Sequence, residues 1–257
     1  MKKHIILFLT TCLVVLFAET YVSIYAQSQT NLNIDFQTAK DVKNYVYNKD
    51  GIYLSLFQLD ELELKLYVQE DQQNLQSVEE VIRTKQLNTA INAGYFHSDY
   101  SHSGLLKISG KTIAPIVPDD VQVTHIVELG KNINIFPAST YTTSNDEKTK
   151  FQTGPLILKD NQIQEDYIHN SLNGDGEYLR SILGITEAGE AFFMATTKLY
   201  SLTDIAEYIL CLNIFHNKTI TAINLDGGTS VALYAQDNED IRLGLEKKLP
   251  FFLGIAK

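Results

Sequence analysis

Apolar and polar residues alternate along much of the chain after residue 50, which is the pattern of half-buried β-strands. The segment GIYLSLFQLDELELKLYVQED, which begins at Gly51, predicts two antiparallel strands joined by a tight turn at Asp60-Glu61. Further alternation predicts hairpins around Ser109-Gly110-Lys111 and around Glu187-Ala188-Gly189-Glu190, and single strands in TITAINL and LPFFLGIAK. Most of the predicted structure is therefore β.

Two segments instead carry the helical repeat of apolar residues. SVEEVIRTKQL has Ser77 and Glu80 at the spacing of a capping box, and SLTDIAEYILCLNIF begins with Ser201 and Asp204 at the same spacing. Many strands, few helices and no regular βαβ alternation favour an α+β fold over a Rossmann or barrel architecture. We expect a single domain with a large mixed, mostly antiparallel β-sheet and a few flanking helices, since no repeat or linker divides the chain.

The N-terminus has the features of an export signal. Lys2-Lys3 supply positive charge, Ile5 to Phe17 is nearly all apolar, and Ile24-Tyr25-Ala26 resembles a cleavage site. We therefore predict a signal peptide at residues 1–26, an N-terminal leader at 27–50, a domain at 51–257, and an exported protein in the periplasm or outside the cell. A retained membrane anchor is the alternative, because the apolar run is long.

Charge and cysteine content exclude several classes of partner. The net charge is −10, and removing Lys2, Lys3 and Glu19 with the signal makes it −11. No cluster of Lys and Arg is present, so no nucleic-acid partner is expected. Only Cys211 follows the predicted signal, so no disulfide is expected within the domain. No zinc-ligand spacing occurs, and we expect no metal and no cofactor, although the many acidic residues leave a divalent ion open.

Four apolar strands stop at small clusters of polar residues and glycine. These clusters are Asn92-Ala93-Gly94-Tyr95-Phe96, Thr153-Gly154-Pro155, Arg180 within YLRSILGI, and Asn224-Leu225-Asp226-Gly227-Gly228-Thr229-Ser230. Glycine at such a place either permits a turn or lets the backbone approach a ligand.

For Asp226 and Arg180 the residues alone leave two readings open. Asp-Gly is a common turn pair, but Asn224 and Asp226 alternate along a strand and so share a face, where two polar groups suit a site better than a core. Arg180 is either a surface residue or a buried cation with an anionic partner, and its planar guanidinium suits the two free oxygens of a phosphodiester.

Taken together, the motifs resemble the phosphodiester glycosidase family. NAGYF, TGPLIL, the Arg180 strand ending at Gly184, the SLTDIAEYI helix and NLDGGTS follow the order and approximate spacing of that family, over roughly Gly51 to Lys257. Two positions depart from its pattern: Thr229 stands where a third glycine is usual, and Arg180-Ser181-Ile182-Leu183-Gly184 replaces Arg-Thr-Ala-Ile-Gly. The chain looks closer to the family's exported bacterial branch.

The resemblance implies cleavage of a sugar-1-phosphodiester bond in a carbohydrate or sugar-phosphodiester substrate. A surface or capsular polysaccharide is one such substrate. It implies Asp226 as the catalytic carboxylate, acting as nucleophile or general base, and Arg180 as the phosphate ligand. The remaining expected substrate-binding residues supply phosphate donors, sugar contacts or close backbone approach; they are Asn92, Gly94, Tyr95, Phe96, Gly154, Asn224, Gly227, Gly228, Thr229 and Ser230.

Two other readings remain. One is a non-catalytic carbohydrate-binding or exopolysaccharide-assembly protein with the same fold. The other is a serine esterase using Ser230, although the sequence lacks the glycine that follows the serine of a nucleophile elbow. A second carboxylate is not identified; Asp99, Asp175 and Glu177 lie in suitable loops.

Overall fold

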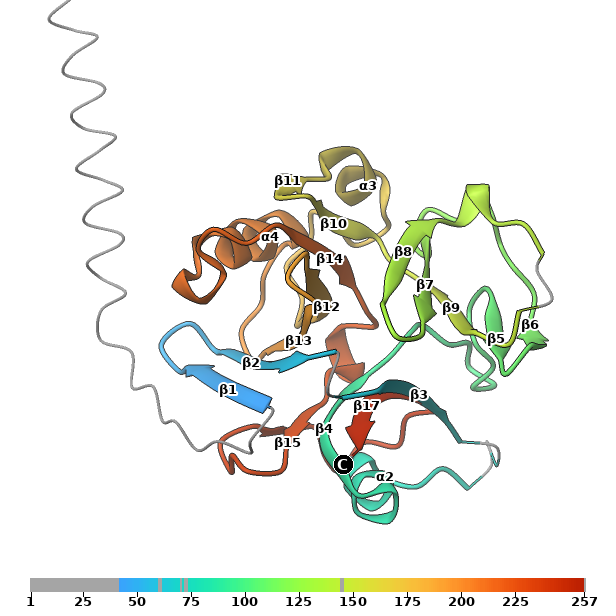
Figure 1. Cartoon of the computed structure of the whole chain (residues 1–257), viewed down its shortest axis with the longest axis horizontal. Helices are drawn as coiled ribbons and strands as arrows, with labels where there is room; N and C mark the ends of the chain where they lie inside the picture. Colours follow the sequence, from blue (N-terminus) through green and yellow to red (C-terminus); the bar gives the residue numbers. More distant parts are fainter. Residues whose placement is uncertain (1–41, 60–61, 70, 72–73, 144–145, 257) are drawn as a thin grey trace, which may run out of the picture. The chain divides into compact units, whose positions relative to one another are not determined.

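The computed structural model describes residues 42–256 except 60–61, 70, 72–73 and 144–145 (Figure 1). The predicted signal peptide and most of the predicted leader lie outside the described residues. No helix within the described part of the chain is long and apolar enough to cross a membrane.

Every pairing between the described strands is antiparallel, and the largest sheet has seven strands in the order β1-β2-β13-β12-β14-β10-β11. Its strands are Val42–Tyr47 (β1), Ile52–Gln58 (β2), Leu156–Lys159 (β10), Gln162–Ile163 (β11), Ser181–Thr186 (β12), Glu190–Thr196 (β13) and Ile220–Asn224 (β14). β13, with the sequence EAFFMAT, is buried along its whole length because it has a neighbour on both edges and packing on both faces.

Two five-stranded sheets complete the β structure. The sheet we call the β4 sheet has the order β16-β15-β4-β17-β3, and the β9 sheet has the order β6-β5-β9-β7-β8. Their strands are Leu64–Val68 (β3), Leu87–Asn92 (β4), Leu106–Ile108 (β5), Lys111–Ala114 (β6), His125–Leu129 (β7), Asn134–Pro137 (β8), Thr149–Thr153 (β9), Leu233–Ala235 (β15), Arg242–Leu243 (β16) and Phe251–Ala256 (β17). In the β4 sheet, segments far apart in the sequence lie side by side, as Figure 1 shows for β4, β15 and β17.

The α+β class and the mostly antiparallel strands predicted from the sequence are confirmed, and the strands form three sheets. The predicted hairpin across Asp60-Glu61 is wrong: β2 pairs with β1 and β13, whereas β3 pairs with β17. Alternation identifies a strand but not its partner, and β2 is buried enough to take a central position while β3 takes an edge. Val42–Tyr47, within the segment assigned to a leader, forms β1 and pairs along its whole length with β2, with Val42 and Tyr47 buried at its two ends.

The helices are Val78–Lys85 (α2), Glu165–Asn170 (α3) and Leu202–Cys211 (α4), with short 3₁₀ turns at Ala138–Thr140 (η1), Asn213–Phe215 (η2) and Gly228–Ser230 (η3). Both predicted capping boxes are confirmed: Ser77 pairs with Glu80, and Ser201 pairs with Asp204. α2 packs against β4, and α3 and α4 pack against β10.

One apolar cluster joins the three sheets. It includes Phe193 from the seven-stranded sheet, Ile91 from the β4 sheet and Phe151 from the β9 sheet, all of them fully buried. The sheets therefore share a core, and the ends of their strands can be held in fixed positions.

Gly184 of β12 tests this packing. It pairs with Phe192 of β13, and a Cβ added at Gly184 would lie 2.0 Å from Cζ of that ring. We expect Gly184→Ala to lower the free energy of unfolding by about 2 kcal/mol or more, because a rigid buried ring must move. Urea denaturation measures the change.

Gly130→Ala is the matched control, since a Cβ there comes no closer than 3.7 Å to another residue. It should change stability by less than about 0.5 kcal/mol. Equal effects of the two substitutions would contradict the packing argument.

Candidate active site

The side chain of Asn92, at the end of β4, joins the strand ends on which the site is built. Its Oδ1 accepts hydrogen bonds from Ser181 Oγ (2.7 Å) and from the backbone N–H of Ala232 (3.1 Å), and its Nδ2 donates to the backbone carbonyl of Asp226. Asn92 is only 2% exposed. Its amide therefore holds β4, the start of β12 and the Asp226 loop together, rather than presenting free groups to solvent.

The Asp226 carboxylate lies in the turn after β14 and is held by its own loop. It accepts hydrogen bonds from the Ser230 side chain and from the Gly227 N–H. The Gly228 N–H donates to the carbonyl of Leu179 (2.8 Å), and Gly228 has a φ of +58°, so glycine suits this turn. Burial raises the pKa of Asp226 to about 6, against the lowering effects of Ser230, Gly227 and the nearby Lys247.

Tyr95 and Asn224 form a second polar group beside Asp226. The Tyr95 hydroxyl donates to the carbonyl of Gly154 (3.2 Å) and accepts from Gln122 Nε2 and Asn224 Nδ2, each at 2.7 Å. Burial, with the Asp226 carboxylate close by, raises the pKa of Tyr95, so its hydroxyl stays protonated. The buried Oδ1 of Asn224 has no hydrogen-bond partner among the described residues.

Arg180, just before β12, is a buried cation and not a surface residue. Its Nε donates to the carbonyl of Tyr200 (2.8 Å), and its Nη2 donates to the carbonyls of Asn173 (2.9 Å) and Gly176. The guanidinium carbon lies 5.2 Å from the centre of the Tyr178 ring. Burial lowers the pKa of Arg180. Nη1 has no hydrogen-bond partner within the described part of the chain.

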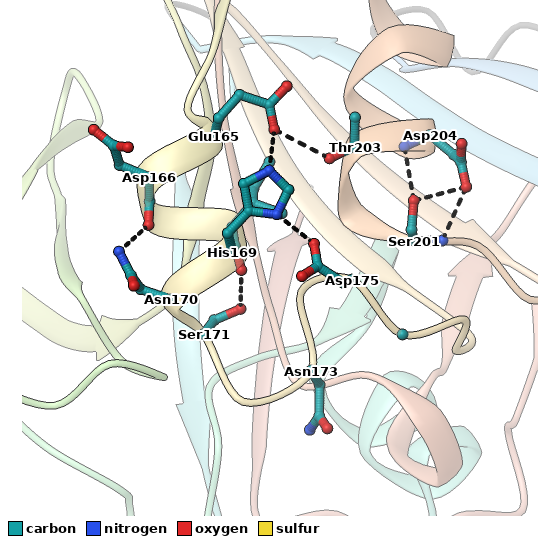
Figure 2. A network of polar contacts seen from close by, with 12 residues as sticks. Glu165, Asp166, His169, Asn170, Ser171, Asn173, Asp175, Ser201, Thr203 and Asp204 are labelled. Carbon is teal, nitrogen blue, oxygen red and sulfur yellow. Dashed lines mark hydrogen bonds and ion pairs between the residues drawn. The ribbon is translucent and has the colours of Figure 1, made fainter.

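The loop that receives Nη2 of Arg180 is tied to α3 through Asp175 and His169, as Figure 2 shows. His169 of α3 hydrogen-bonds Asp175 through Nδ1 and lies 3.1 Å from Glu165 through Nε2, and both carboxylates raise the pKa of His169. The backbone N–H of Leu202 in α4 donates to the carbonyl of Gly174 (3.0 Å). Arg180 is thus clamped by a loop that is itself fixed.

Arg180 lies next to the Asp226 loop. A Cβ added at Gly227 would lie 2.7 Å from the carbonyl oxygen of Leu179 and 3.9 Å from Cα of Arg180. Asn92, Arg180 and Asp226, predicted from separate motifs, are therefore brought to one place.

The other predicted residues occupy three kinds of position. A Cβ at Gly94 would lie 2.6 Å from the buried His102 Nε2, so glycine is needed there for close packing. Phe96 stacks on Tyr100, with ring centres 5.9 Å apart, and packs against the apolar core. Thr229 is exposed.

The acids considered as a second carboxylate do not join Asp226. Asp175 bonds to His169, Asp99 bonds to Ser101, and Glu177 is exposed. No group of three or more His, Cys, Asp or Glu side chains suited to a metal ion occurs among the residues that the structure describes.

Three residues at the site were not identified from the sequence. Ser181 bonds to Asn92, Gln122 bonds to Tyr95, and Lys247 lies close enough to Asp226 to lower its pKa. Ser181 follows Arg180 directly and so lay within a recognised motif. Gln122 and Lys247 lie in polar loops with no distinguishing pattern.

Solved structures share this fold. The catalytic domain of zebrafish N-acetylglucosamine-1-phosphodiester alpha-N-acetylglucosaminidase, auto-inhibited by its pro-peptide, aligns with a TM-score of 0.59 at 13% identity, over 84% of this chain and 81% of that one. A protein from Synechocystis aligns at 0.58 and 11% identity, over 84% and 64%, and one from Burkholderia pseudomallei aligns at 0.57 and 8%, over 80% and 74%. Identities this low establish the fold alone.

A search of curated protein sequences found no match. A family model described as phosphodiester glycosidase matches residues 85–256. That segment is most of the chain and contains Asn92, Arg180 and Asp226, and the protein therefore belongs to the phosphodiester glycosidase family.

Proposed function

We propose that this protein is an exported hydrolase that cleaves a sugar-1-phosphodiester, with Asp226 as the catalytic carboxylate. The observation that carries the proposal is the environment of Asp226. It is a mostly buried acid with a pKa raised to about 6, in the one place where the recognised strand-end motifs meet. A carboxyl with a pKa close to neutral can act as base or nucleophile under ordinary conditions.

The charges around Asp226 suit a reaction in which the bond from the anomeric carbon to the phosphate oxygen breaks. An oxocarbenium-like carbon would be stabilised by the Asp226 carboxylate, and the departing phosphate by a cation. Arg180 keeps Nη1 for such a contact while its other donors are held by carbonyls. Phosphate is a weak base as a leaving group, so one carboxylate is sufficient in principle.

The neighbouring polar groups suit a sugar. The buried Oδ1 of Asn224 lacks a donor among the described residues, and a sugar hydroxyl would supply one if the side chains that enclose it moved aside. Asn92, Gly227 and Gly228 use their side-chain or backbone donors within the protein, so they support the site and Asp226 rather than the ligand.

The cellular setting is part of the proposal. The apolar N-terminal run after Lys2-Lys3 supports export, and an exported enzyme of this family would meet sugar phosphodiesters in surface or capsular polymers. The alternative is a carbohydrate-binding or exopolysaccharide-assembly protein without turnover; the pKa of Asp226 favours the enzyme.

The first test is hydrolysis of a panel of sugar-1-phosphodiesters by the mature protein. We expect Asp226→Asn to reduce kcat by about 10³-fold or more, because the reacting carboxylate is lost while its shape is kept. Arg180→Ala should also reduce kcat/KM. Product release is followed by chromatography.

Asp160→Asn is the matched control, since Asp160 is an exposed acid with a φ of +50° that asparagine tolerates. It should retain full activity. The proposal would be contradicted if folded Asp226→Asn protein hydrolysed the substrate at the wild-type rate, or if the wild type cleaved no member of the panel.

The rate of hydrolysis should also depend on pH. If Asp226 acts as an ionised base or nucleophile, kcat/KM should rise with pH and level off above about 6, where the carboxyl has lost its proton. A rate that instead falls above that pH would identify Asp226 as a general acid.

The stability of the protein should depend on pH through the same carboxyl. The native carboxyl of Asp226 keeps its proton up to about pH 6, whereas its ordinary pKa is 3.8, so the native state binds more protons between these values and stability falls as pH rises through them. Asp226→Asn removes this cost. It should raise the free energy of unfolding by about 1–3 kcal/mol at about pH 8 and leave it nearly unchanged at about pH 4.

Urea denaturation of both proteins at the two pH values measures this difference. A gain in stability that is the same at both values would show that ionisation of Asp226 is not its cause.

A further inference from the structure

Arg180 has only part of its guanidinium left for a phosphate. Nε and Nη2 already donate to three backbone carbonyls, and the side chain is 3% exposed. A phosphodiester carries one negative charge before cleavage, and the departing phosphate monoester carries more, so a second cation close to Asp226 would be expected in a working site.

Lys247 is placed to be that cation. It lies in the connection between β16 and β17, where its backbone N–H donates to the carbonyl of Gly244 (3.1 Å) and its carbonyl accepts from Val78 N–H (2.9 Å). Its Nζ donates to the carbonyl of Val231 (2.8 Å), the residue after Ser230. The Lys247 ammonium is thus fixed beside the segment that holds Asp226.

The chain makes room for this side chain at Gly244. A Cβ added there would lie 2.5 Å from the carbonyl oxygen of Val231 and 3.0 and 3.1 Å from Cδ and Cε of Lys247. Gly244 also has a φ of +60°, which favours glycine. The methylene groups of Lys247 therefore pass over the backbone at Gly244, where any side chain would collide with them.

Lys247 and Asp226 affect each other without forming an ion pair. The ammonium lowers the pKa of Asp226, and Asp226 and the exposed Glu246 raise the pKa of Lys247, although burial has the larger effect and lowers it. Within the described part of the chain, Val231 is the only hydrogen-bond partner of Nζ, which leaves two N–H donors.

We infer that Lys247 binds the phosphate group of the substrate through the two remaining N–H donors of its Nζ, together with Arg180. This inference rests on the proposed function. If Lys247 only fixed the Val231 backbone, its loss would weaken the binding of charged and neutral ligands equally. If it contacts the phosphate, its loss would weaken the binding of anions alone. Experiment can separate these two roles.

Binding of inorganic phosphate to the folded, mature protein tests the inference without any need for turnover. Phosphate should raise the melting temperature of the wild type, because it binds the native state. In Lys247→Met its affinity should fall about 10-fold or more, and Lys247→Arg should retain most of it.

Lys248→Met is the matched control, since Lys248 is the exposed neighbour in the same loop. It should behave as the wild type does. Melting temperatures without phosphate show whether Lys247→Met is folded. If it is not, Lys247→Arg replaces it in the comparison of phosphate affinities. Unchanged phosphate affinity in Lys247→Met, or a loss of the same size in Lys248→Met, would overturn the inference.

Kinetics give the second readout. On a sugar-1-phosphodiester, kcat/KM of Lys247→Met should fall about 100-fold, while on the neutral nitrophenyl glycoside of the same sugar it should change by less than about 3-fold. Equal losses on both substrates would show that Lys247 only fixes the Val231 backbone, and would contradict the inference. If the wild type cleaves neither substrate, the proposed function fails, and phosphate binding still decides the role of Lys247.

Discussion

The site depends on the hydrogen bonds of one buried amide, that of Asn92. Its two acceptor bonds, from Ser181 and Ala232, and its donor bond to the Asp226 carbonyl connect β4 with β12 and with the loop after β14. Aspartate at this position would lose the donor and place a charge beside a carbonyl oxygen, and a shorter side chain would leave buried groups unpaired. β12 and β14 are paired in one sheet and β4 belongs to another, so this amide ties the end of β4 to the two strand ends that carry Arg180 and Asp226.

The charged groups of the site are held by neutral dipoles rather than by one another. Arg180 is satisfied by carbonyls and Asp226 by a hydroxyl and an N–H. A direct ion pair between them would lower the pKa of Asp226 and use up both charges. Holding each charge with dipoles costs stability through desolvation, as the raised pKa of Asp226 indicates, but keeps the charges available for a ligand. Such a cost is expected at a functional site.

Local features of the fold could be predicted from the sequence, because their causes are local. Capping boxes at Ser77 and Ser201 and the hairpin at Ser109-Gly110 follow from residues that are neighbours in the chain. Strand partners could not, since β2 and β3 are close in sequence but pair in different sheets. At the site, motifs identified Asp226 and Arg180. The burial of Arg180 and the hydrogen bonds of Asn92 could not be predicted, because they depend on contacts between distant segments. Lys247 reaches the site only through the packing at Gly244, which no local pattern reveals.

Hydrogen bonding divides the recognised residues into those that are satisfied within the protein and a smaller set with bonding capacity left. Asn92, Gly227 and Gly228 are satisfied by the protein, and Gly94 is needed for packing against His102. Groups with bonding capacity left are Nη1 of Arg180, Oδ1 of Asn224 and the Asp226 carboxylate. A cationic donor, a neutral acceptor and a carboxylate are what the two halves of a sugar phosphodiester require. A motif shared within a family can therefore fix the position of a polar group as well as supply one. Thr229, which stands where the resemblance leads us to expect a third glycine, is exposed.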